Sequence, residues 1–570
     1  MATQEITLTR QSLPFGAEVL RGGGVRFRLW APGAKAIDLS IAGKFLPMKG
    51  NDGWFEHIEP KAGAGTRYRY RIDGELLVPD PASRFQPEDV GGPSEVIDPE
   101  AFNWGNTAWR NRPWNEAVIY ELHVGTFTPS GTYRGVIEKL PALTDIGITA
   151  IELMPLSDFA GKRNWGYDGV LPYAPDSAYG RPEDLKALID AAHGAGLMVM
   201  LDVVYNHFGP EGNYLPRYAP QFFTDRHKTP WGAAIDFSND VVRKFFVHNV
   251  RYWLEEYRLD GLRFDAVHAI IDESPKHILN EIRAAVPTTK HLVLENDANQ
   301  ARFIGPQRYT AQWNDDSHHG YHVLATGESD GYYVAYADAP AKHLARCLAE
   351  GFAYQGEESP FSKEPRGEPS AHLPPSCFVD FLQNHDQIGN RAFGERLTQL
   401  SEHSKLKALS AIQLLAPSPP LLFMGEEWGC KQPFLFFCDF QGDLGEAVRK
   451  GRREEFSRFA SFKSSIPDPL AESTFKQCVL NWDQRDEGWL AHYRELLQLR
   501  ARAIAPRDFG PGRYRMLGER AFEVDWDGLT LIANCGDQPV QVSDVPQGQP
   551  LWSNGKPGAP WSVNWWTGNP

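Results

Sequence analysis

The sequence predicts an α/β protein, a (β/α)8 TIM barrel with an N-terminal β-sandwich and a C-terminal β-sandwich domain. Three observations predict it. Residues 1–105 form short runs that alternate apolar and polar side chains, residues 106–505 alternate apolar runs with amphipathic stretches, and residues 506–570 return to short alternating runs. Alternating strand and helix patterns are typical of a parallel sheet, whereas short alternating runs separated by turn residues are typical of antiparallel sheets.

The first domain, residues 1–105, is expected to be a small immunoglobulin-like sandwich. Strand patterns cover residues 25–30, 36–41 and 68–72, and the last of them ends in the turn pair Asp73-Gly74. Gly, Pro and Asp residues separate the runs, as in a sandwich of short strands. Residues 78–93 are rich in Pro and Gly and are expected to cross to the next domain.

The middle of the chain carries the barrel pattern. Seven apolar runs are expected as strands, at residues 118–122, 149–153, 198–204, 262–264, 291–294, 378–382 and 421–424. Helical patterns lie between them, for example at residues 183–195, 241–257 and 404–415. An eighth strand near residues 309–313 would close the barrel.

Two connections are too long to be simple loops, and the chain ends in strand patterns. Residues 208–240 are expected to form a small subdomain over the barrel mouth, and residues 351–375 to form a lid or a loop that lines the substrate site. Near the C-terminus, two alternating runs flank the turn pair Asp527-Gly528, which predicts a hairpin in a second sandwich.

Composition excludes several classes of function. The net charge is −15 with no basic run, which argues against nucleic acid and anionic membrane as partners. The six cysteines include no CxxC pair and no zinc-ligand spacing, so we expect no disulfide framework, no metal and no cofactor. Residues 1–10 do not have the pattern of a signal peptide, and no window is apolar enough to span a membrane, so a cytoplasmic location is expected.

Three acidic residues end three of the predicted strands: Asp265, Glu295 and Asp386. The carboxyl ends of barrel strands converge on one mouth, so these carboxylates are expected to face one another there. Such a group, with Arg263 and histidines beside it, is suited to acid/base and nucleophilic attack on a glycosidic bond. The alternatives are that Asp265 caps a helix and that Glu295 belongs to a polar loop.

Four motifs resemble those of the α-amylase superfamily, glycoside hydrolase family 13. They are DVVYNH at 202–207, GLRFD at 261–265, Glu295 and NHD at 384–386, and they occur in the order of that family. Three further segments are most similar in sequence to those of the family members that release trehalose: WGYDGV at 165–170, YAP at 173–175 and residues 382–391. The resemblance covers nearly the whole chain. It implies a carbohydrate-binding-module-like first domain, although that domain could equally buttress the barrel.

The resemblance also implies the reaction. It is hydrolysis, with retention, of the α-1,4 bond between a maltooligosaccharide and a terminal trehalose unit. Asp265 would be the nucleophile, and Glu295 the general acid if burial raises its pKa. Asp386 would hold sugar hydroxyls. The substrate, maltooligosyltrehalose, links the chain to the synthase that makes it, and physical association with that synthase is left open.

The remaining site residues follow from the same resemblance. Arg263 would keep Asp265 ionised. The other residues expected to bind substrate are His207, His385, Tyr167, Trp165, His268, Asn384 and Trp428. For Trp165 and Trp428, stacking on sugar and plain packing remain equally open. Asp202 is expected to be a structural partner. Asn206, a calcium ligand in many α-amylases, is expected to make a structural hydrogen bond instead.

One departure from the superfamily bears on the leaving group. Many α-amylases place Lys-His three and four residues after the nucleophile, where this chain has His268 and Ala269. The different residues at these two positions agree with a leaving group such as trehalose.

The nearest alternative is a glycogen branching enzyme. Branching enzymes usually carry Pro-Ala-His in the first motif and an acidic residue after the last aspartate, where this chain has Tyr205-Asn206-His207 and Gln387. Isoamylase-type debranching is disfavoured because its motif follows His-Asp with Gly. A non-catalytic carbohydrate-binding protein is the alternative of another class, and the intact acidic triad argues against it.

Overall fold

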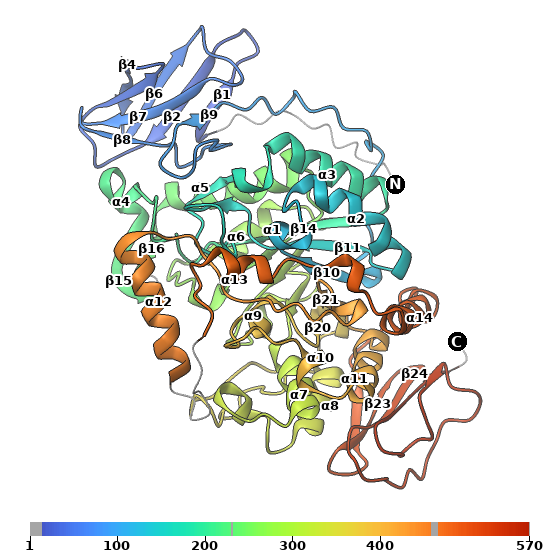
Figure 1. Cartoon of the computed structure of the whole chain (residues 1–570). Coiled ribbons are helices and arrows are strands. Elements are labelled where there is room, and N and C mark those ends of the chain that lie inside the picture. The colour runs from blue at the N-terminus through green and yellow to red at the C-terminus, as the bar shows by residue number, and fades with distance from the viewer. Residues whose placement is uncertain (1–13, 230–231, 458–465, 569–570) are drawn as a thin grey trace.

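The computed structural model describes residues 14–229, 232–457 and 466–568. Residues 1–13, at the start of the predicted first domain, lie outside this range, as do two residues of the predicted 208–240 subdomain. A barrel occupies the middle of the molecule, with the N-terminal sandwich at one end and the C-terminal sheet at the other (Figure 1).

The N-terminal domain is a sandwich of two antiparallel sheets. One sheet has the order β1-β2-β6-β5 and the other β4-β3-β7-β8, with β9 paired to β7. Their bounds are β1 Gly16–Val19, β2 Val25–Trp30, β3 Ile37–Ile41, β4 Lys44–Pro47, β5 Lys49–Asn51, β6 Trp54–Glu59, β7 Arg67–Ile72, β8 Leu76–Val78 and β9 Ser94–Glu95. In β2, Val25, Phe27 and Leu29 are buried while Arg26 and Arg28 are half-buried, as strand alternation requires. The predicted sandwich is confirmed.

Eight parallel strands form a closed barrel. They are β10 Ile119–Leu122, β11 Ala150–Leu153, β14 Met198–Val203, β17 Gly261–Phe264, β18 His291–Leu294, β19 Ala311–Trp313, β20 Phe378–Phe381 and β21 Pro420–Phe423. All seven predicted strands are present, and β19 is the eighth strand that the sequence places at residues 309–313. The predicted barrel is confirmed.

The barrel interior changes character along its axis. Apolar side chains fill the lower layers, among them Ile119, Met200 and Phe381. Nearer the carboxyl ends, the inward positions carry Glu121 on β10, Glu152 on β11, and Asp202 and Arg263 on β14 and β17. Asp202 and Arg263 are register partners. Charged groups therefore cluster inside the barrel directly below the strand ends.

Helices surround the barrel on most connections (Figure 1). The main ones are α2 Tyr133–Ile146, α3 Pro182–Gly194, α5 Asp240–Arg251, α6 Ile278–Ala285, α7 Asp315–Thr326, α8 Pro340–Glu350, α11 His403–Leu415 and α14 Glu487–Ala503. The predicted helix at 241–257 is α5 followed by a π-helical segment, Tyr252–Glu256. Between β18 and β19 the described chain contains only a short 3-10 helix, Ala301–Phe303.

The 208–240 insertion connects the barrel to the sandwich. It contains α4 Leu215–Tyr218, the 3-10 helix Pro220–Phe222 and a hairpin of β15 Phe223–Thr229 with β16 Gly232–Ile235. Gly33 of the sandwich donates its backbone N–H to the Tyr218 carbonyl at 2.8 Å. The Phe222 ring lies 5.5 Å from Trp30 and 5.3 Å from Phe245 of α5. Its position over the mouth stays a prediction.

A further long insertion was not anticipated from the sequence. It follows β21 and includes the 3-10 helix Glu426–Trp428, α12 Gly442–Ser457 and α13 Glu472–Gln477. Cys438 and Phe440 of this insertion form one buried apolar cluster with Val170 and Leu171, and Leu444 of α12 packs against it. Trp165 donates its indole N–H to the Leu435 carbonyl at 3.0 Å.

The C-terminal domain differs from the predicted second sandwich. Its strands form one antiparallel sheet, β22-β23-β24-β26-β25. They are β22 Arg513–Met516, β23 Ala521–Trp526, β24 Leu529–Asn534, β25 Trp552–Ser553 and β26 Ser562–Thr567, which include the predicted hairpin. The sheet packs on α8 and α11, and Trp565 donates its indole N–H to the Ala411 carbonyl. The prediction of a second facing sheet was wrong because these helices supply the apolar surface that it would have provided.

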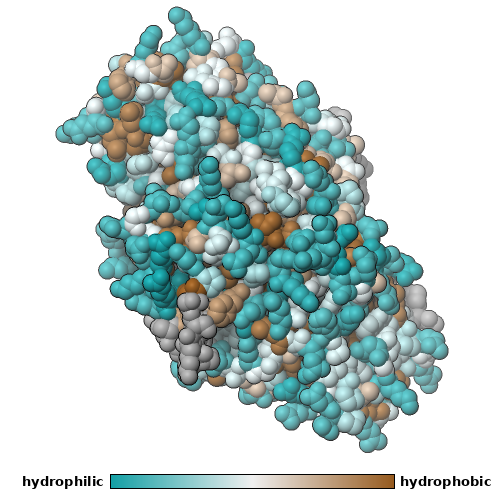
Figure 2. Space-filling view, viewed as in Figure 1, coloured by the Kyte–Doolittle hydropathy of each residue, from teal (hydrophilic) through white to brown (hydrophobic). Residues whose placement is uncertain are grey.

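The surface is largely polar. Figure 2 shows hydrophilic side chains over most of the visible face, with small, separate apolar areas. Among the described residues, no helix is both long and apolar enough to cross a membrane.

Candidate active site

Arg263 on β17 is the centre of the site. Its Nη1 lies 2.6 Å from Asp202 Oδ2 and 3.0 Å from Asp265 Oδ1, and its Nη2 lies 2.7 Å from Glu295 Oε2. The guanidinium is buried and covers the Trp313 ring, 4.1 Å from the ring centroid. Burial opposes its charge, but the carboxylates, Asp202 first, raise its pKa well above the ordinary value. Two predicted catalytic carboxylates therefore share one guanidinium.

Asp265 sits where β17 ends, and it is held from two sides. Oδ1 accepts a hydrogen bond from Arg263, and Oδ2 accepts one from Asn206 Nδ2 at 2.7 Å. Asn206 thus makes the structural hydrogen bond that the sequence predicts. The next residue, Ala266, has φ of +39°, a left-handed conformation that is strained for a residue with a side chain. This sharp turn presents Asp265 at the strand end.

Glu295 follows β18, the neighbouring strand. Its Oε2 accepts hydrogen bonds from Arg263 and from the backbone N–H of Ala266 at 2.9 Å. The residue just after Asp265 therefore binds Glu295, which fixes the two carboxyl groups relative to each other. The Glu295 side chain is 23% exposed, so the burial expected of a general acid is incomplete here.

Asp386 lies on the short helix α9, His385–Gly389, which follows β20. Asn384 begins this helix, because its side chain accepts hydrogen bonds from the backbone of Asp386 and Gln387. Asn390 Nδ2 donates to Asp386 Oδ1 at 2.8 Å. Burial raises the pKa of Asp386, and the charges of His385 and Glu295 also act on it, in opposite directions. The third acid is thus within electrostatic reach of Glu295.

The two histidines have different surroundings. His385 Nδ1 lies 2.5 Å from Glu121 Oε1, and Glu121 Oε2 accepts the His385 backbone N–H at 3.0 Å. Burial opposes the imidazolium, yet the Glu121 carboxylate raises the pKa of His385. His207 Nε2 contacts the Tyr167 carbonyl at 2.9 Å, and burial lowers the pKa of this histidine. His385 therefore favours the charged form and His207 the neutral one.

The aromatic residues beside the acids form a layer. The Tyr167 ring stacks on His385 at 5.1 Å between centroids, and its hydroxyl donates to Asp202 Oδ2 at 2.6 Å. Trp165 packs edge-on against His385 and stacks on Phe434, and only 5% of it is exposed. We therefore interpret Trp165 as a residue that packs behind His385, and not as one that stacks on a sugar ring.

Two further predictions of substrate contact are corrected by the structure. Trp428 is 1% exposed and packs on Trp482 at 4.5 Å, so it is covered by other residues of the chain. Asn384 is also buried, and its carbonyl oxygen is used in capping α9. His268, in contrast, is exposed, and its Nδ1 accepts the backbone N–H of Asp297 at 3.3 Å. It remains available to a ligand.

Sequence analysis missed three acidic residues near the site: Glu121, Glu152 and Asp315. Glu121 and Glu152 each stand inside an apolar strand run, an unusual position that could have identified them. Asp202 was taken as a partner only, and its pKa is raised by burial to about 7. Asp315 begins α7 between the ends of β18 and β20, and burial raises its pKa, with Glu295 adding to the effect.

No metal arrangement accompanies these acids in the part of the chain that the structure describes. There, no group of three or more His, Cys, Asp or Glu side chains is placed to hold an ion.

Comparisons with known proteins agree with this geometry. Residues 96–230 match the alpha amylase catalytic domain model, and residues 14–99 match the model of carbohydrate-binding module 48, the isoamylase N-terminal domain. A malto-oligosyltrehalose trehalohydrolase from Deinococcus radiodurans is 45% identical over 85% of this chain and 82% of its own length. One from Saccharolobus solfataricus is 42% identical over 84% and 85%.

The chain belongs to the malto-oligosyltrehalose trehalohydrolase family. The predicted family and the predicted class of enzyme, a glycosidase of the α-amylase superfamily, are thereby confirmed. The crystal structure of a Salmonella typhimurium protein that carries the name of an alpha amylase is also similar to this trehalohydrolase family member. It has 48% identity and a TM-score of 0.94, and the match covers 97% of this chain and 99% of that one.

A branching enzyme of Streptomyces coelicolor is a more distant relative of the family. It is 35% identical over 45% of this chain and 38% of its own length. The branching enzyme therefore matches only part of this chain, whereas the trehalohydrolases match most of it.

Proposed function

We propose that this chain cleaves the α-1,4 bond between a maltooligosaccharide and a terminal trehalose unit with retention, releasing trehalose. The observation that carries the catalytic assignment is the Arg263 guanidinium bonded to both Asp265 and Glu295 at adjacent strand ends. Retaining glycosidases need two carboxyl groups about 5–5.5 Å apart, and two carboxylates on one guanidinium are suited to that spacing.

Asp265 acts as the nucleophile in the first step. One of its oxygens attacks the anomeric carbon, and the bond to the trehalose oxygen breaks. A proton from Glu295 goes to that oxygen, so free trehalose leaves and a glycosyl ester remains. Arg263 and Asn206 hold the attacking carboxylate in place through hydrogen bonds to its two oxygens.

Water completes the reaction in the second step. Glu295, now a carboxylate, takes a proton from water while the water oxygen attacks the anomeric carbon. The ester bond breaks and Asp265 is regenerated. Two inversions at the same carbon give net retention.

Glu295 must hold a proton for the first step, although it contacts Arg263. Bound sugar would cover the exposed part of its side chain.

Asp386, His385 and His207 would bind the sugar on the non-reducing side of the bond. Bonds from Asp386 to ring hydroxyls would strengthen as the ring flattens in the transition state. Tyr167 would contact the same sugar, with His385 fixing its ring. We further propose the domain limits 1–105, 106–505 and 506–570, a cytoplasmic location, and supply of the substrate by the synthase that makes maltooligosyltrehalose.

Product analysis tests the proposal. Purified protein is given maltotriosyltrehalose, maltopentaose and amylose in separate reactions, and the products are separated by chromatography. Trehalose and maltotriose from the first substrate are expected to form fastest. Preferential cleavage of maltopentaose, or new α-1,6 branches in amylose, would assign the chain to an amylase or a branching enzyme instead.

A further inference from the structure

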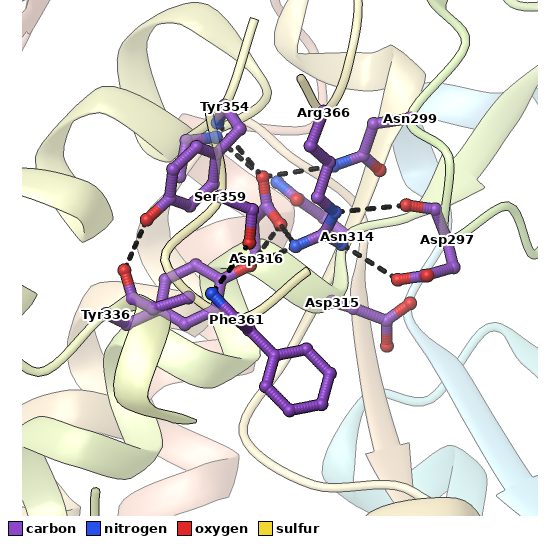
Figure 3. Close-up of polar contacts among 12 residues, drawn as sticks. Asp297, Asn299, Asn314, Asp315, Asp316, Tyr336, Tyr354, Ser359, Phe361 and Arg366 are labelled. Atoms are coloured by element: carbon purple, nitrogen blue, oxygen red, sulfur yellow. Dashed lines mark hydrogen bonds and ion pairs between the residues drawn. The ribbon is translucent and has the colours of Figure 1, made fainter. Parts of the chain in front are cut away.

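We infer that Arg366 is a positioning residue that fastens the 351–375 segment to the loop carrying Glu295 and thereby sets the preference for trehalose as leaving group. This inference rests on the proposed function. Neither Arg366 nor its partners Asp297 and Asp316 appear in the four motifs. Figure 3 shows Arg366 between Asp297 on one side and Asp316 on the other.

The first contact of Arg366 is with the acid-bearing loop. Its Nη2 lies 3.0 Å from Asp297 Oδ1, and its Nε donates to the Asp297 carbonyl at 3.1 Å. Asp297 lies two residues after Glu295, so a side chain and a backbone oxygen of this loop are both held. The Arg366 side chain is 14% exposed, whereas that of Asp297 is 72% exposed. The Asp297 carboxylate therefore keeps an open side toward solvent or a ligand.

The second contact is with the start of α7. Arg366 Nη1 lies 3.1 Å from Oδ1 of Asp316, which is fully buried, and it also donates to the Tyr336 hydroxyl. Burial opposes the arginine charge, but Asp316 and Tyr336, followed by Asp297, raise its pKa. The guanidinium is thus a fixed cation between a buried carboxylate and an exposed one.

Asp316 also binds the 351–375 segment without help from Arg366. Its Oδ2 accepts the backbone N–H of Ala353 at 2.8 Å and Asn299 Nδ2 at 3.1 Å, and Tyr336 donates to Oδ1 at 2.5 Å. The buried carboxylate therefore keeps several donors when Arg366 is removed. For this reason we expect an Arg366 variant to fold.

The contact between Arg366 and Asp297 lies on the side of the site where the leaving group departs. Asp297 follows the acid Glu295, which protonates the departing oxygen. Its backbone N–H is bound by His268, which lies three residues after the nucleophile and is exposed. In the α-amylase superfamily that position lines the site of the leaving sugar. A chain of contacts through His268, Asp297 and Arg366 thus runs from the turn after the nucleophile to the 351–375 segment, along one side of the mouth.

A charged carboxylate with an open side, held by a rigid arginine, suits a polyhydroxy leaving group. Trehalose has no reducing end and is bent about its α-1,1 linkage, so its second ring points in a different direction from that of maltose. A surface of the substrate site that is fixed relative to Glu295 can discriminate between trehalose and maltose by their shapes. A surface that shifts by about 1 Å loses much of this discrimination.

The test compares Arg366→Ala with Arg302→Ala. Arg302 also joins the two segments, through Glu368, but it is largely exposed and makes no contact with Asp297 among the described hydrogen bonds and ion pairs. For each protein, kcat and KM are measured on maltotriosyltrehalose and on maltopentaose, together with the unfolding midpoint. Arg366→Ala is expected to lower the ratio of the two kcat/KM values by about ten-fold or more, mainly through KM for the trehalose substrate. Arg302→Ala is expected to leave the ratio within about two-fold.

Two further variants separate positioning from stability. Arg366→Lys keeps the charge but not the two-sided contact, so it is expected to recover more of the unfolding midpoint than of the substrate ratio. Asp297→Ala should give the same loss of ratio as Arg366→Ala, and the double variant should lose no more than either single one.

Two outcomes would overturn the inference. If Arg366→Ala lowers both substrates equally, or if the double variant shows additive losses, Arg366 has a structural role only. A wild-type protein with no preference for the trehalose-ended substrate would overturn the proposed function as well, and the two failures are therefore distinguishable.

Discussion

At the scale of single residues, one buried arginine controls the charge of the site. Arg263 contacts three carboxylates and lies on an aromatic ring. Removing its guanidinium would therefore leave buried carboxylates without their partner. The two acids proposed as catalytic differ in their remaining contacts: Asp265 has an amide donor from Asn206, and Glu295 has an open side. That difference holds the proposed nucleophile in a fixed orientation and leaves the proposed acid accessible from one side.

Asp265→Asn should remove almost all turnover, by roughly 10³-fold or more, because an amide cannot form the ester intermediate. The fold should stay intact, because Arg263 keeps its ion pairs with Asp202 and Glu295. Steady-state assays and thermal unfolding of the same preparation measure both effects. A variant that retains a tenth of the activity would exclude Asp265 as the nucleophile.

Glu121→Gln should destabilise the protein in a pH-dependent way. The folded-state pKa of His385 is raised above 6.5, so the pair contributes its full stability below pH 6.5 and loses it as the pH rises through the raised pKa. Removing one partner of a buried pair costs about 3 kcal/mol. Urea unfolding at pH 6 and pH 9 should show a larger difference from wild type at pH 6. An equal difference at both values would contradict this assignment of charge.

At the scale of elements, the ends of the strands carry the chemistry and their middles carry the packing. β11 is an exception, because Glu152 lies within it, is buried and has no hydrogen-bond partner for either oxygen among the residues that the structure describes. Burial raises the pKa of Glu152 well above 4.5, and the charges of Glu121 and Asp202 add to this effect. The protonated form is therefore favoured in the folded barrel.

Glu152→Gln should stabilise the barrel at neutral pH. Above pH 4.5 the unfolded chain ionises Glu152 while the fold retains the proton, so wild-type stability falls as the pH rises toward the folded-state pKa. The amide avoids this loss, and the gain at pH 7 is expected to be on the order of 1–3 kcal/mol. Urea unfolding at pH 4 and pH 7 measures it, with Glu138→Gln on the exposed side of α2 as control. A variant less stable than wild type at pH 7 would contradict a protonated Glu152.

At the scale of the whole molecule, the 208–240 insertion joins the sandwich to the barrel. Phe222 is the central contact, since its ring touches Trp30 of the sandwich and Phe245 of α5. These ring contacts fasten the sandwich to the barrel, and its role in binding glucan or in buttressing the barrel stays a prediction.

Phe222→Ala should weaken this junction. The lost ring is buried on both sides, so the variant is expected to be less stable by about 3–5 kcal/mol. Calorimetry should then show the sandwich unfolding separately from the barrel. Ile58→Ala, at a half-exposed position of the sandwich, is the control and should change little. An unchanged single transition for Phe222→Ala would argue that other contacts hold the two domains together.

The sequence predicted most of the barrel because its strands are short apolar runs between amphipathic helices, and β19 was recognised from the need to close the sheet. The triad was predictable because each acid ends such a run. Trp428 was not, because an aromatic residue near a motif has the same sequence signal whether it faces solvent or packs on another aromatic residue such as Trp482. The C-terminal sheet was misjudged for a related reason, since an apolar strand face does not reveal whether a sheet or a helix covers it.

By itself, the sequence determined the strand order, the motif residues and the family, because these follow from local patterns along the chain. Only the tertiary structure decided which side chains share a partner: Asp265 and Glu295 on Arg263, His385 on Glu121, and Asp297 with Asp316 on Arg366. Such pairs join residues that are up to hundreds of positions apart. Their energies depend on distance and burial, which exist only once the chain has closed into a barrel.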